Sequence, residues 1–425
     1  MNKTLIGSIF ALTTLVMGCS SQPNEQLLAQ SNSQNQNSSQ HKNEQQPYSL
    51  TYVSNTRIAA NKNKLAQSQP HVVNALESML KKADKALTRK LNPVTNKPQA
   101  GPSGSKHDYV SIGPYWWPDK TKADGLPWIR KDGEVNPLTR GNNTDQTRAK
   151  AFLHDLGALN LAYLYTHQKE YLHKAKQLIN TWLINPDTKM NPNLDYAQGV
   201  PGSSTGRPFG VIEWENIANV VTSIELLNAY KMADNHFIEQ SNAWLNEYLT
   251  WLLTSKIGIA EGATKNNHAT WYDYQVIGLM LHLGQKDNAK AYTHTVKRRR
   301  IDSQIHKSGA QPHELARTKS VSYTSMNLMA FLKVAELAKQ VDIDLLHYKG
   351  DKGQSIKAAT QYLQLHAQGH KKWKHPQIGG AKKAFKDKAM STLFVANQLF
   401  NDDADLAKFI KQNHQYVKPD LLLTF

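Results

Sequence analysis

The chain has 425 residues, of which 40% are hydrophobic, and it carries a formal net charge of +17 with a pI near 9.6. This length allows one large domain or two to three ordinary ones, each with a buried core. The charge predicts attraction to a polyanion: nucleic acid, anionic lipid or acidic polysaccharide. A single cysteine excludes a disulfide within the chain and a cysteine-ligated metal site.

Residues 1–18 are typical of a bacterial lipoprotein signal peptide. MNK supplies a positive start, and LIGSIFALTTLVMG is an apolar run too short to span a membrane comfortably. The run ends at Cys19, whose lipidation would explain a lone thiol in an exported chain. A plain secretory signal followed by an incidental cysteine is the alternative.

Residues 19–47 are rich in Ser, Gln and Asn and contain almost no aromatic side chains, which predicts a disordered tether. Because Ser20 rather than an aspartate follows Cys19, we expect an exported protein anchored by lipid to the outer membrane, facing the periplasm or the cell surface. Residues 48–425 would then be the folded domain, in contact with the membrane only through the anchor.

Apolar residues recur at helical spacing through most of the folded part, and strand-like alternation is scarce. Residues 70–91 place one apolar face at Val73, Leu76, Leu80, Ala83 and Leu87. Helix pairs are predicted at 151–166 with 171–183, 217–232 with 237–253, and 274–284 with 287–305, followed by helices at 325–341, 355–366 and 388–412. Repeated hairpins predict an all-α fold, either an α-solenoid or an α/α toroid.

Long polar loops rich in Gly and Pro separate these hairpins at 92–145, 185–212 and 306–322. Loops of that length inside a compact domain are usually functional. We therefore expect an incomplete α/α toroid whose loops gather at one mouth and form a cleft.

The first loop mixes aromatic and basic residues in HDYVSIGPYWWPDKTKADGLPWIRKDGEVNP, residues 107–137. Flat aromatic faces stack on the apolar faces of sugar rings, and the interleaved cations suit acidic sugars. Its aromatic residues are Tyr109, Tyr115, Trp116, Trp117 and Trp128. For Trp116 and Trp117 a hydrophobic plug at one end of the barrel is an equally good interpretation.

The second loop, VPGSSTGRPFGVIEWENIANV, contains glycines and serines that let a ligand approach the backbone closely. Its polar and aromatic content includes Arg207, Glu213 and Trp214. Hydrolysis of a glycoside needs two carboxylates opposed across the bond. Glu215 would point away from Glu213 on a helix, so an ordinary structural role fits either residue better.

The third and fourth loops read TKNNHATWYD and KSGAQPHELARTKSVSYTSMNL. The third places Asn267 and His268 at the start of a predicted helix, and the fourth supplies Arg317 with Tyr323 six residues later. An isolated histidine here would be a satisfied loop residue. The chain has no HExxH, no GxSxG and no phosphate-binding loop, so these common catalytic motifs give no support to another reaction.

Taken in order, GPYWWPD with GLPWIRKDGEVNP, GRPFGVIEW, NNHATWYD and QPHELARTKSVSY resemble the alginate lyase superfamily of α/α-toroid polysaccharide lyases. The resemblance spans roughly residues 105–330, and it implies a catalytic set of Asn267, His268, Arg317 and Tyr323. Mannuronan-cleaving members carry one more residue between the Arg and the Tyr. The chain is more similar to a neighbouring branch that includes alginate and glucuronan lyases. The substrate-binding residues expected around this set are Tyr115, Trp116, Trp117, Arg207, Trp214, Asn266, Trp271, Tyr272, His313 and Glu314.

This chemistry removes the C5 proton of a 4-linked uronate and expels the O4 substituent. Asn267 and Arg317 would neutralise the carboxylate and stabilise the enolate-like transition state. Tyr323 is the expected acid and base, with a phenol pKa that a nearby Arg317 would lower. His268 would orient the carboxylate or serve as base when the C5 proton lies on the opposite face. No metal or cofactor is expected.

Two other classes of function remain to be weighed. A surface lipoprotein that binds glycans without cutting them would explain the anchor, the charge and the YWW loop, but would not need the Arg and Tyr behind an Asn-His pair. A nucleic-acid binder would explain the charge and the basic run at 297–300. That run is more typical of a solvated helix face, and export also argues against nucleic acid as a partner.

Overall fold

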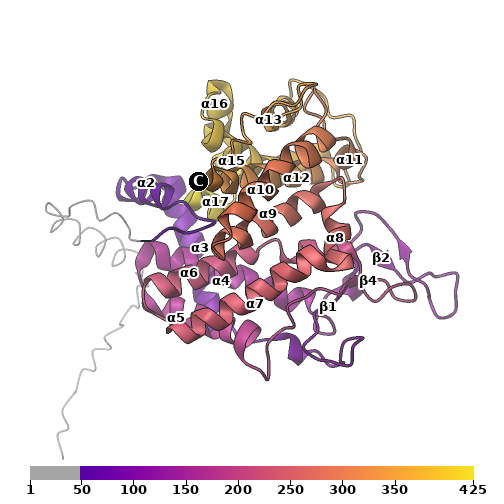
Figure 1. Cartoon of the computed structure of the whole chain (residues 1–425). Coiled ribbons are helices and arrows are strands. Elements are labelled where there is room, and N and C mark those ends of the chain that lie inside the picture. Colours follow the sequence, from indigo (N-terminus) through magenta and orange to yellow (C-terminus); the bar gives the residue numbers. More distant parts are fainter. Residues whose placement is uncertain (1–47) are drawn as a thin grey trace, which may run out of the picture. The chain divides into compact units, whose positions relative to one another are not determined.

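The computed structural model describes residues 48–425, which form helices joined by long loops (Figure 1). The longer helices are α2 (Asn55–Ala66), α3 (Pro70–Thr88), α4 (Gln146–Thr166), α5 (Lys169–Ile179), α6 (Ile217–Ala229), α7 (Asn235–Thr254), α9 (Asn267–His282), α10 (Lys286–Val296), α12 (Ser320–Ala338), α13 (Ile356–Ala367), α15 (Met390–Phe400) and α16 (Ala404–Asn413). The predicted signal peptide, lipidation at Cys19 and tether lie outside the described residues. Within the described part, no helix combines the length and apolarity that a membrane crossing requires.

The helices α4, α6, α9 and α12 form the interior of the fold. Every residue of α9 except His268 and His282 is buried. A helix buried on all sides has neighbours on every face. In keeping with this, α4 packs against α3 and α6, and α9 packs against α6, α10 and α12.

The partner helices α5, α7, α10 and α13 each bury a single face. In α7 the buried residues recur every three or four positions, at Phe237, Ser241, Trp244, Leu245, Tyr248, Leu249 and Leu252. This is the pattern of an outer helix with one face on the core. The predicted pairs α4 with α5, α6 with α7, and α9 with α10 are confirmed, and the architecture is the expected incomplete α/α toroid.

The two ends of the described domain meet. The C-terminal helix α17 (Pro419–Thr424) packs against α2, α3 and α4. The carbonyl oxygen of Leu423 accepts hydrogen bonds from Asn61 Nδ2 at 3.0 Å and from the Tyr165 hydroxyl at 2.8 Å. These contacts fix the last turn of the chain to the first helices of the domain.

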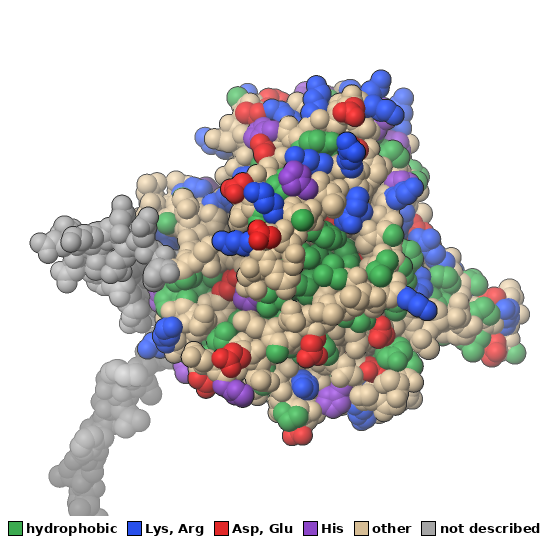
Figure 2. Space-filling view, in the orientation of Figure 1, with side chains coloured by type: hydrophobic (Ala, Val, Ile, Leu, Met, Phe, Trp, Pro, Cys, Tyr) green, Lys and Arg blue, Asp and Glu red, His purple; other side chains and the backbone are tan. Residues whose placement is uncertain are grey.

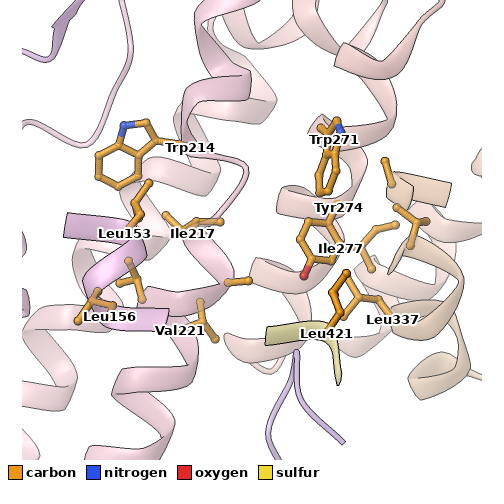
Figure 3. Packing of buried hydrophobic residues seen from close by; sticks show 14 of the residues in the cluster. Leu153, Leu156, Trp214, Ile217, Val221, Trp271, Tyr274, Ile277, Leu337 and Leu421 are labelled. Carbon is orange, nitrogen blue, oxygen red and sulfur yellow. The ribbon is translucent and has the colours of Figure 1, made fainter. Parts of the chain in front are cut away.

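One continuous hydrophobic core joins the inner helices. Figure 3 shows part of it, with labelled residues Leu153, Leu156, Trp214, Ile217, Val221, Trp271, Tyr274, Ile277, Leu337 and Leu421. Each large apolar side chain that is fully buried contributes about 1.5–3 kcal/mol relative to exposure. The core therefore supplies a rigid frame from which the loops extend.

Two small sheets organise the loops. β1 (Val110–Ile112) pairs in parallel with β4 (Tyr196–Gly199), which joins the first long loop to the second. β2 (Trp116–Trp117) pairs antiparallel with β3 (Ile129–Arg130) and forms a hairpin inside the first loop. In Figure 1 this hairpin extends on the same side of the molecule as α8 (Lys256–Gly262) and α11 (Pro312–Leu315).

The structure corrects the predicted apolar face of α3. Its buried residues are Val72, Ala75, Met79, Ala83 and Ala86. Of the predicted set only Ala83 is buried, because the smaller residues face the tightly packed neighbours while Leu76, Leu80 and Leu87 lie at the edge of the core. The sequence interpretation also missed α2, α8 and α17.

Candidate active site

Asn266 begins α9 and thereby places the Asn-His pair at the start of the helix. It is the N-cap residue, and its Oδ1 accepts a hydrogen bond from the backbone N–H of His268 at 3.2 Å. Asparagine is among the preferred N-cap residues because its side chain satisfies a free N–H of the first turn. The side-chain oxygen of Asn266, a residue predicted to bind substrate, thus stabilises the start of α9.

Asn267 is held by a buried carboxylate from α11. The Oε1 atom of Glu314 accepts from the Asn267 backbone N–H at 2.6 Å, and both Glu314 oxygens accept from Asn267 Nδ2, at 3.0 and 2.9 Å. Both residues are 1% exposed. Burial raises the pKa of Glu314, although the Asn267 bonds oppose this. Glu314 therefore acts as a clamp on Asn267, and its predicted contact with substrate stays a prediction.

Replacing Glu314 with glutamine should loosen this clamp. Glutamine carries an NH2 group in place of one carboxylate oxygen, so its N–H groups would face those of Asn267 with no acceptor between them. A buried donor without an acceptor costs about 1–3 kcal/mol. We expect the free energy of unfolding in urea to fall by about that amount and turnover to fall with it. The exposed neighbour His313 provides the control, since His313→Gln should change stability by no more than about 0.5 kcal/mol. Equal effects of both substitutions on the free energy of unfolding would contradict the clamp.

His268 pairs with a second buried carboxylate. Its Nδ1 lies 2.7 Å from Oε1 of Glu261, which is fully buried in α8. A carboxylate partner places a proton on Nδ1 and leaves Nε2 outside this contact. The ring of Phe209 packs edge-on against the imidazole at 5.0 Å. These two contacts fix both the tautomer and the orientation of His268.

Arg317 and Tyr323 lie in direct contact at the start of α12. Arg317 Nη2 donates to the Tyr323 hydroxyl at 2.9 Å, and the guanidinium carbon lies 3.9 Å from the ring centroid. The hydroxyl of Tyr115, from the first loop, lies 2.6 Å from the hydroxyl of Tyr323. The fourth and first loops therefore meet at one phenol oxygen.

Burial raises the pKa of Tyr323 well above its usual range, with a further contribution from Tyr115 and against the opposing charge of Arg317. The sequence had led us to expect a lowered value. Arg317 acts in the expected direction, but removal of the phenol from water outweighs it. In these surroundings Tyr323 is a neutral phenol.

Asp132 occupies the other side of the Arg317 fork. Its two oxygens lie 2.7 Å from Nη2 and 3.2 Å from Nε. Thr318 also binds it, through its hydroxyl at 2.8 Å and its backbone N–H at 3.3 Å. Despite burial, hydrogen bonds from Arg317 and Thr318 hold the pKa of Asp132 well below its usual range. The β2–β3 hairpin is thus tied by this carboxylate to the loop that carries Arg317.

A line of stacked side chains connects the first two loops to His268. The guanidinium of Arg207 lies 5.2 Å from the ring of Trp116 and 5.4 Å from the ring of Phe209, which contacts His268. Trp117 packs under Lys131 at 5.2 Å. Both tryptophans are partly exposed and lie outside the hydrophobic core. This arrangement favours the cleft-lining interpretation of Trp116 and Trp117 over the plug.

Three aromatic residues predicted to bind substrate are buried in the structure. Trp214 is fully buried and stacks on Trp244 with ring centroids 5.6 Å apart. Tyr272 is 4% exposed and its hydroxyl donates to the Leu252 carbonyl. Trp271 is 6% exposed and packs against another aromatic ring. Their large apolar surfaces hold the core and the start of α9 in place, which gives all three a structural role.

The carboxylates of the second loop have structural surroundings. Glu213 accepts hydrogen bonds from the hydroxyls of Tyr109 at 2.7 Å and Ser111 at 2.6 Å. This confirms the ordinary structural role that the sequence favoured. The functional contacts that the sequence did not reveal are those of Glu261, Asp132 and Phe209. Among the described residues, no group of three His, Cys, Asp or Glu side chains is arranged to hold a metal ion.

Comparisons with known proteins agree with this arrangement. The family model described as alginate lyase matches residues 93–373. The crystal structure of an alginate lyase from Bacteroides ovatus superimposes with a TM-score of 0.82 and 30% identity, covering 88% of this chain and 99% of that one. Alginate lyase A1-III from a Sphingomonas species gives a TM-score of 0.56 at 18% identity, with 88% and 95% covered. A tetrasaccharide complex of A1-III gives 0.58 at 18% identity and the same coverage. No curated protein sequence matches the chain. The chain therefore belongs to the alginate lyase family and is a polysaccharide lyase.

Proposed function

We propose that this lyase cleaves 4-linked polyuronates, either alginate, especially mannuronate-containing alginate, or glucuronan, by β-elimination and leaves unsaturated uronate ends. The observation that carries the proposal is the Tyr323 hydroxyl, which lies 2.9 Å from Arg317 Nη2 and 2.6 Å from the Tyr115 hydroxyl. A proton-transfer group beside a fixed cation is what removal of a proton next to a carboxylate requires. A structural neighbour solved with a tetrasaccharide supports a saccharide ligand for the same fold.

The first task of the site is to stabilise the uronate carboxylate as negative charge spreads into it. Arg317 is 17% exposed and already binds the carboxylate of Asp132, so a substrate carboxylate suits the same guanidinium. Asn267 gives both its N–H groups to Glu314, which leaves a buried Oδ1 without a partner among the described residues. Asn267 therefore fits as an acceptor, from a protonated carboxyl or a sugar hydroxyl, and not as the donor that the sequence suggested.

The second task is to move the C5 proton to the leaving oxygen. In mannuronate and glucuronate both lie on the same side of the sugar ring, so Tyr323 can serve as base and then as acid. Arg317 and Tyr115 both reach its oxygen and stabilise the phenolate that takes the C5 proton and that is restored when this proton passes to the leaving oxygen. In guluronate the C5 proton and the leaving oxygen lie on opposite sides of the ring. His268 would then share the proton transfer with Tyr323 through its Nε2.

The raised pKa of Tyr323 sets the expected pH dependence. If the phenolate must form before reaction, its fraction grows tenfold per pH unit until the pH reaches a pKa above the ordinary value of ~10. We therefore expect kcat/KM on the best polyuronate to keep rising from neutral pH into the alkaline range, as measured in buffers of constant ionic strength. A rate that is already constant above about pH 8 would exclude Tyr323 as a base that ionises first.

A panel of purified polymannuronate, polyguluronate, mixed alginate and glucuronan tests the proposal directly. Elimination creates a conjugated double bond that absorbs ultraviolet light, whereas binding alone creates none. We expect absorbance to increase with polymannuronate or glucuronan. Binding of these polymers without any increase would favour the glycan-binding alternative.

We further propose that Cys19 is lipidated and anchors the enzyme at the outer membrane. The support is the signal-like sequence of residues 1–18 and the polar composition of residues 19–47. Fractionation of cells that express the full chain tests this, since the protein should sediment with membranes. Recovery in the soluble fraction would contradict the anchor.

A further inference from the structure

A lysine-rich segment, residues 370–388, adjoins the candidate site. Its sequence, HKKWKHPQIGGAKKAFKDK, contains seven lysines and one aspartate, and all seven lysines are exposed. Most of it lies beyond residue 373, where the match to the family model ends. No part of the mechanism described above uses this charge.

Backbone hydrogen bonds attach the segment to the loop that carries Arg317. Ile378 N–H donates to the Thr318 carbonyl at 2.9 Å, and Ser320 N–H donates to the Pro376 carbonyl at 3.1 Å. The backbone N–H of Val321 also binds a side chain of the segment, at 2.9 Å. Thr318 is the residue next to Arg317 and itself binds Asp132. The segment is therefore in fixed register with the reacting groups.

Aromatic packing makes this attachment rigid. Trp373 Nε1 donates to the Ser320 hydroxyl at 2.9 Å, and its ring packs edge-on against Phe385 at 5.5 Å and His366 at 5.1 Å. Gly379 and Gly380 have φ values of 80° and 86°, which turn the chain into α14 (Ala381–Ala384). Side chains other than glycine rarely adopt this conformation. The lysines before and after the turn are thus carried on an ordered support.

The positive charge of the segment is largely uncompensated. Within the described part of the chain, no carboxylate forms an ion pair with Lys374, Lys382 or Lys388, and Asp387 pairs with Lys383. The side chain of Lys388 is exposed, but partial desolvation of its ammonium, followed by repulsion from Lys418, lowers its pKa. Cations crowded together without anions repel one another, and a bound polyanion relieves that repulsion.

Lys319 connects this charge to the candidate site. It follows Arg317 by two residues, forms an isolated β-bridge with Gln377 of the segment, and contributes to the repulsion felt by Lys388. Figure 2 shows lysine and arginine side chains gathered over the end of the molecule where Figure 1 places α11 and α13. The cationic surface thus begins beside Arg317 and extends away from it.

We propose that residues 370–388 form an extended binding surface for the polyuronate chain, holding carboxylates of sugar units beyond those that occupy the catalytic groups. The proposal rests on the proposed function, since it takes the substrate to be an acidic polymer. Of the possible polyanions, a polymer that continues from the site is favoured because the segment is fixed to the loop of Arg317. The surface should steer long chains to the cleft and contribute little to short ones.

The test compares two triple variants with the same loss of charge. K374Q/K382Q/K388Q neutralises the segment, and K81Q/K85Q/K169Q neutralises exposed lysines of α3 and α5, neither of which packs against α11 or α12. In low salt we expect the segment variant to lower kcat/KM on the polymer by about tenfold and the control to match wild type. The loss should be smaller on a trisaccharide and should shrink at high salt, because screening weakens exposed charges. K374R/K382R/K388R keeps the charge and should retain wild-type values.

Affinity for the polymer in a Tyr323→Phe background separates this proposal from the proposed function. Weaker binding of the segment variant in that background supports the surface even where turnover is absent. Equal kinetics and equal binding for the two glutamine variants would overturn the proposal. It would also be overturned if the segment variant lost binding only to phosphatidylglycerol vesicles, which would make the segment a membrane contact. A wild-type protein that yields no unsaturated product from any polyuronate would instead contradict the proposed function.

Discussion

Replacing Tyr323 with phenylalanine should lower kcat on the best polyuronate by ~10²–10⁴-fold, the usual cost of losing an acid–base group. The loss should lie toward the upper end because one oxygen is proposed to act both as base and as acid. KM should change little, because the hydroxyl that is removed is bonded to Tyr115 and Arg317 and is proposed to transfer a proton, not to bind substrate. Initial rates from ultraviolet absorbance across a range of polymer concentrations give both constants.

The control for this substitution is the fold itself. Tyr323→Phe removes little volume, so thermal unfolding and circular dichroism should remain close to wild type. Tyr362→Phe, on the outer helix α13, removes a hydroxyl whose only close partner in the described structure is His375, at 3.3 Å, and should leave kcat unchanged. Turnover near the wild-type value in Tyr323→Phe would show that another group moves the proton.

Arg317→Lys should be the second most damaging conservative change, with a loss of about 10²-fold in kcat. The arginine fork binds both Asp132 oxygens and the Tyr323 hydroxyl at once. An ammonium is a compact charge on a flexible stem and cannot reproduce this planar geometry. The phenolate and the uronate carboxylate would each lose a directed donor, so steady-state kinetics should show the larger change in kcat.

Arg130→Lys is a matched control for that substitution. Arg130 pairs with the same carboxylate, Asp132 Oδ1, at 2.6 Å, but its side chain is 52% exposed. Exposed pairs contribute ~1 kcal/mol or less, so the control should keep nearly full activity. Similar losses in the two variants would mean that Asp132, and not the contact of Arg317 with Tyr323, is what the reaction depends on.

Local patterns in the sequence predicted the fold, whereas the position of the candidate site was implied by the motifs that resemble alginate lyases. The hairpins α4 with α5 and α6 with α7 follow from apolar residues at helical spacing, since inner and outer helices must both bury a face. The poor helix formers Asn and His at the start of a predicted helix, in the stretch 264–273, also indicated a functional site there. Asn266 accounts for part of that signal as an N-cap, which a local pattern can reveal.

The partners of the site residues could not be predicted, because they come from distant parts of the chain. Asp132 precedes Arg317 by 185 positions, and Glu314 follows Asn267 by 47. Nothing in the local sequence distinguishes these carboxylates from exposed ones. The same limit explains Trp214, whose loop motif resembles a ligand site although its ring lies in the core.

The pKa of Tyr323 illustrates the limit in energetic terms. The sequence revealed the cation six residues away, whose field lowers the pKa, but the depth of burial that raises it depends on the packing of the first loop. Desolvation of a phenol and attraction to a cation oppose each other. Only the three-dimensional structure decides which of the two is larger.

The central claim is β-elimination, and mass spectrometry of the products tests it most directly. Purified protein is incubated with polymannuronate and with glucuronan. The masses of the oligosaccharides released are then compared with those of the products of the Tyr323→Phe variant. We expect wild-type products that are lighter by one water than the saturated oligosaccharides of the same length, and far fewer products from the variant. Saturated products, or polymers left intact by the wild-type protein, would contradict the account.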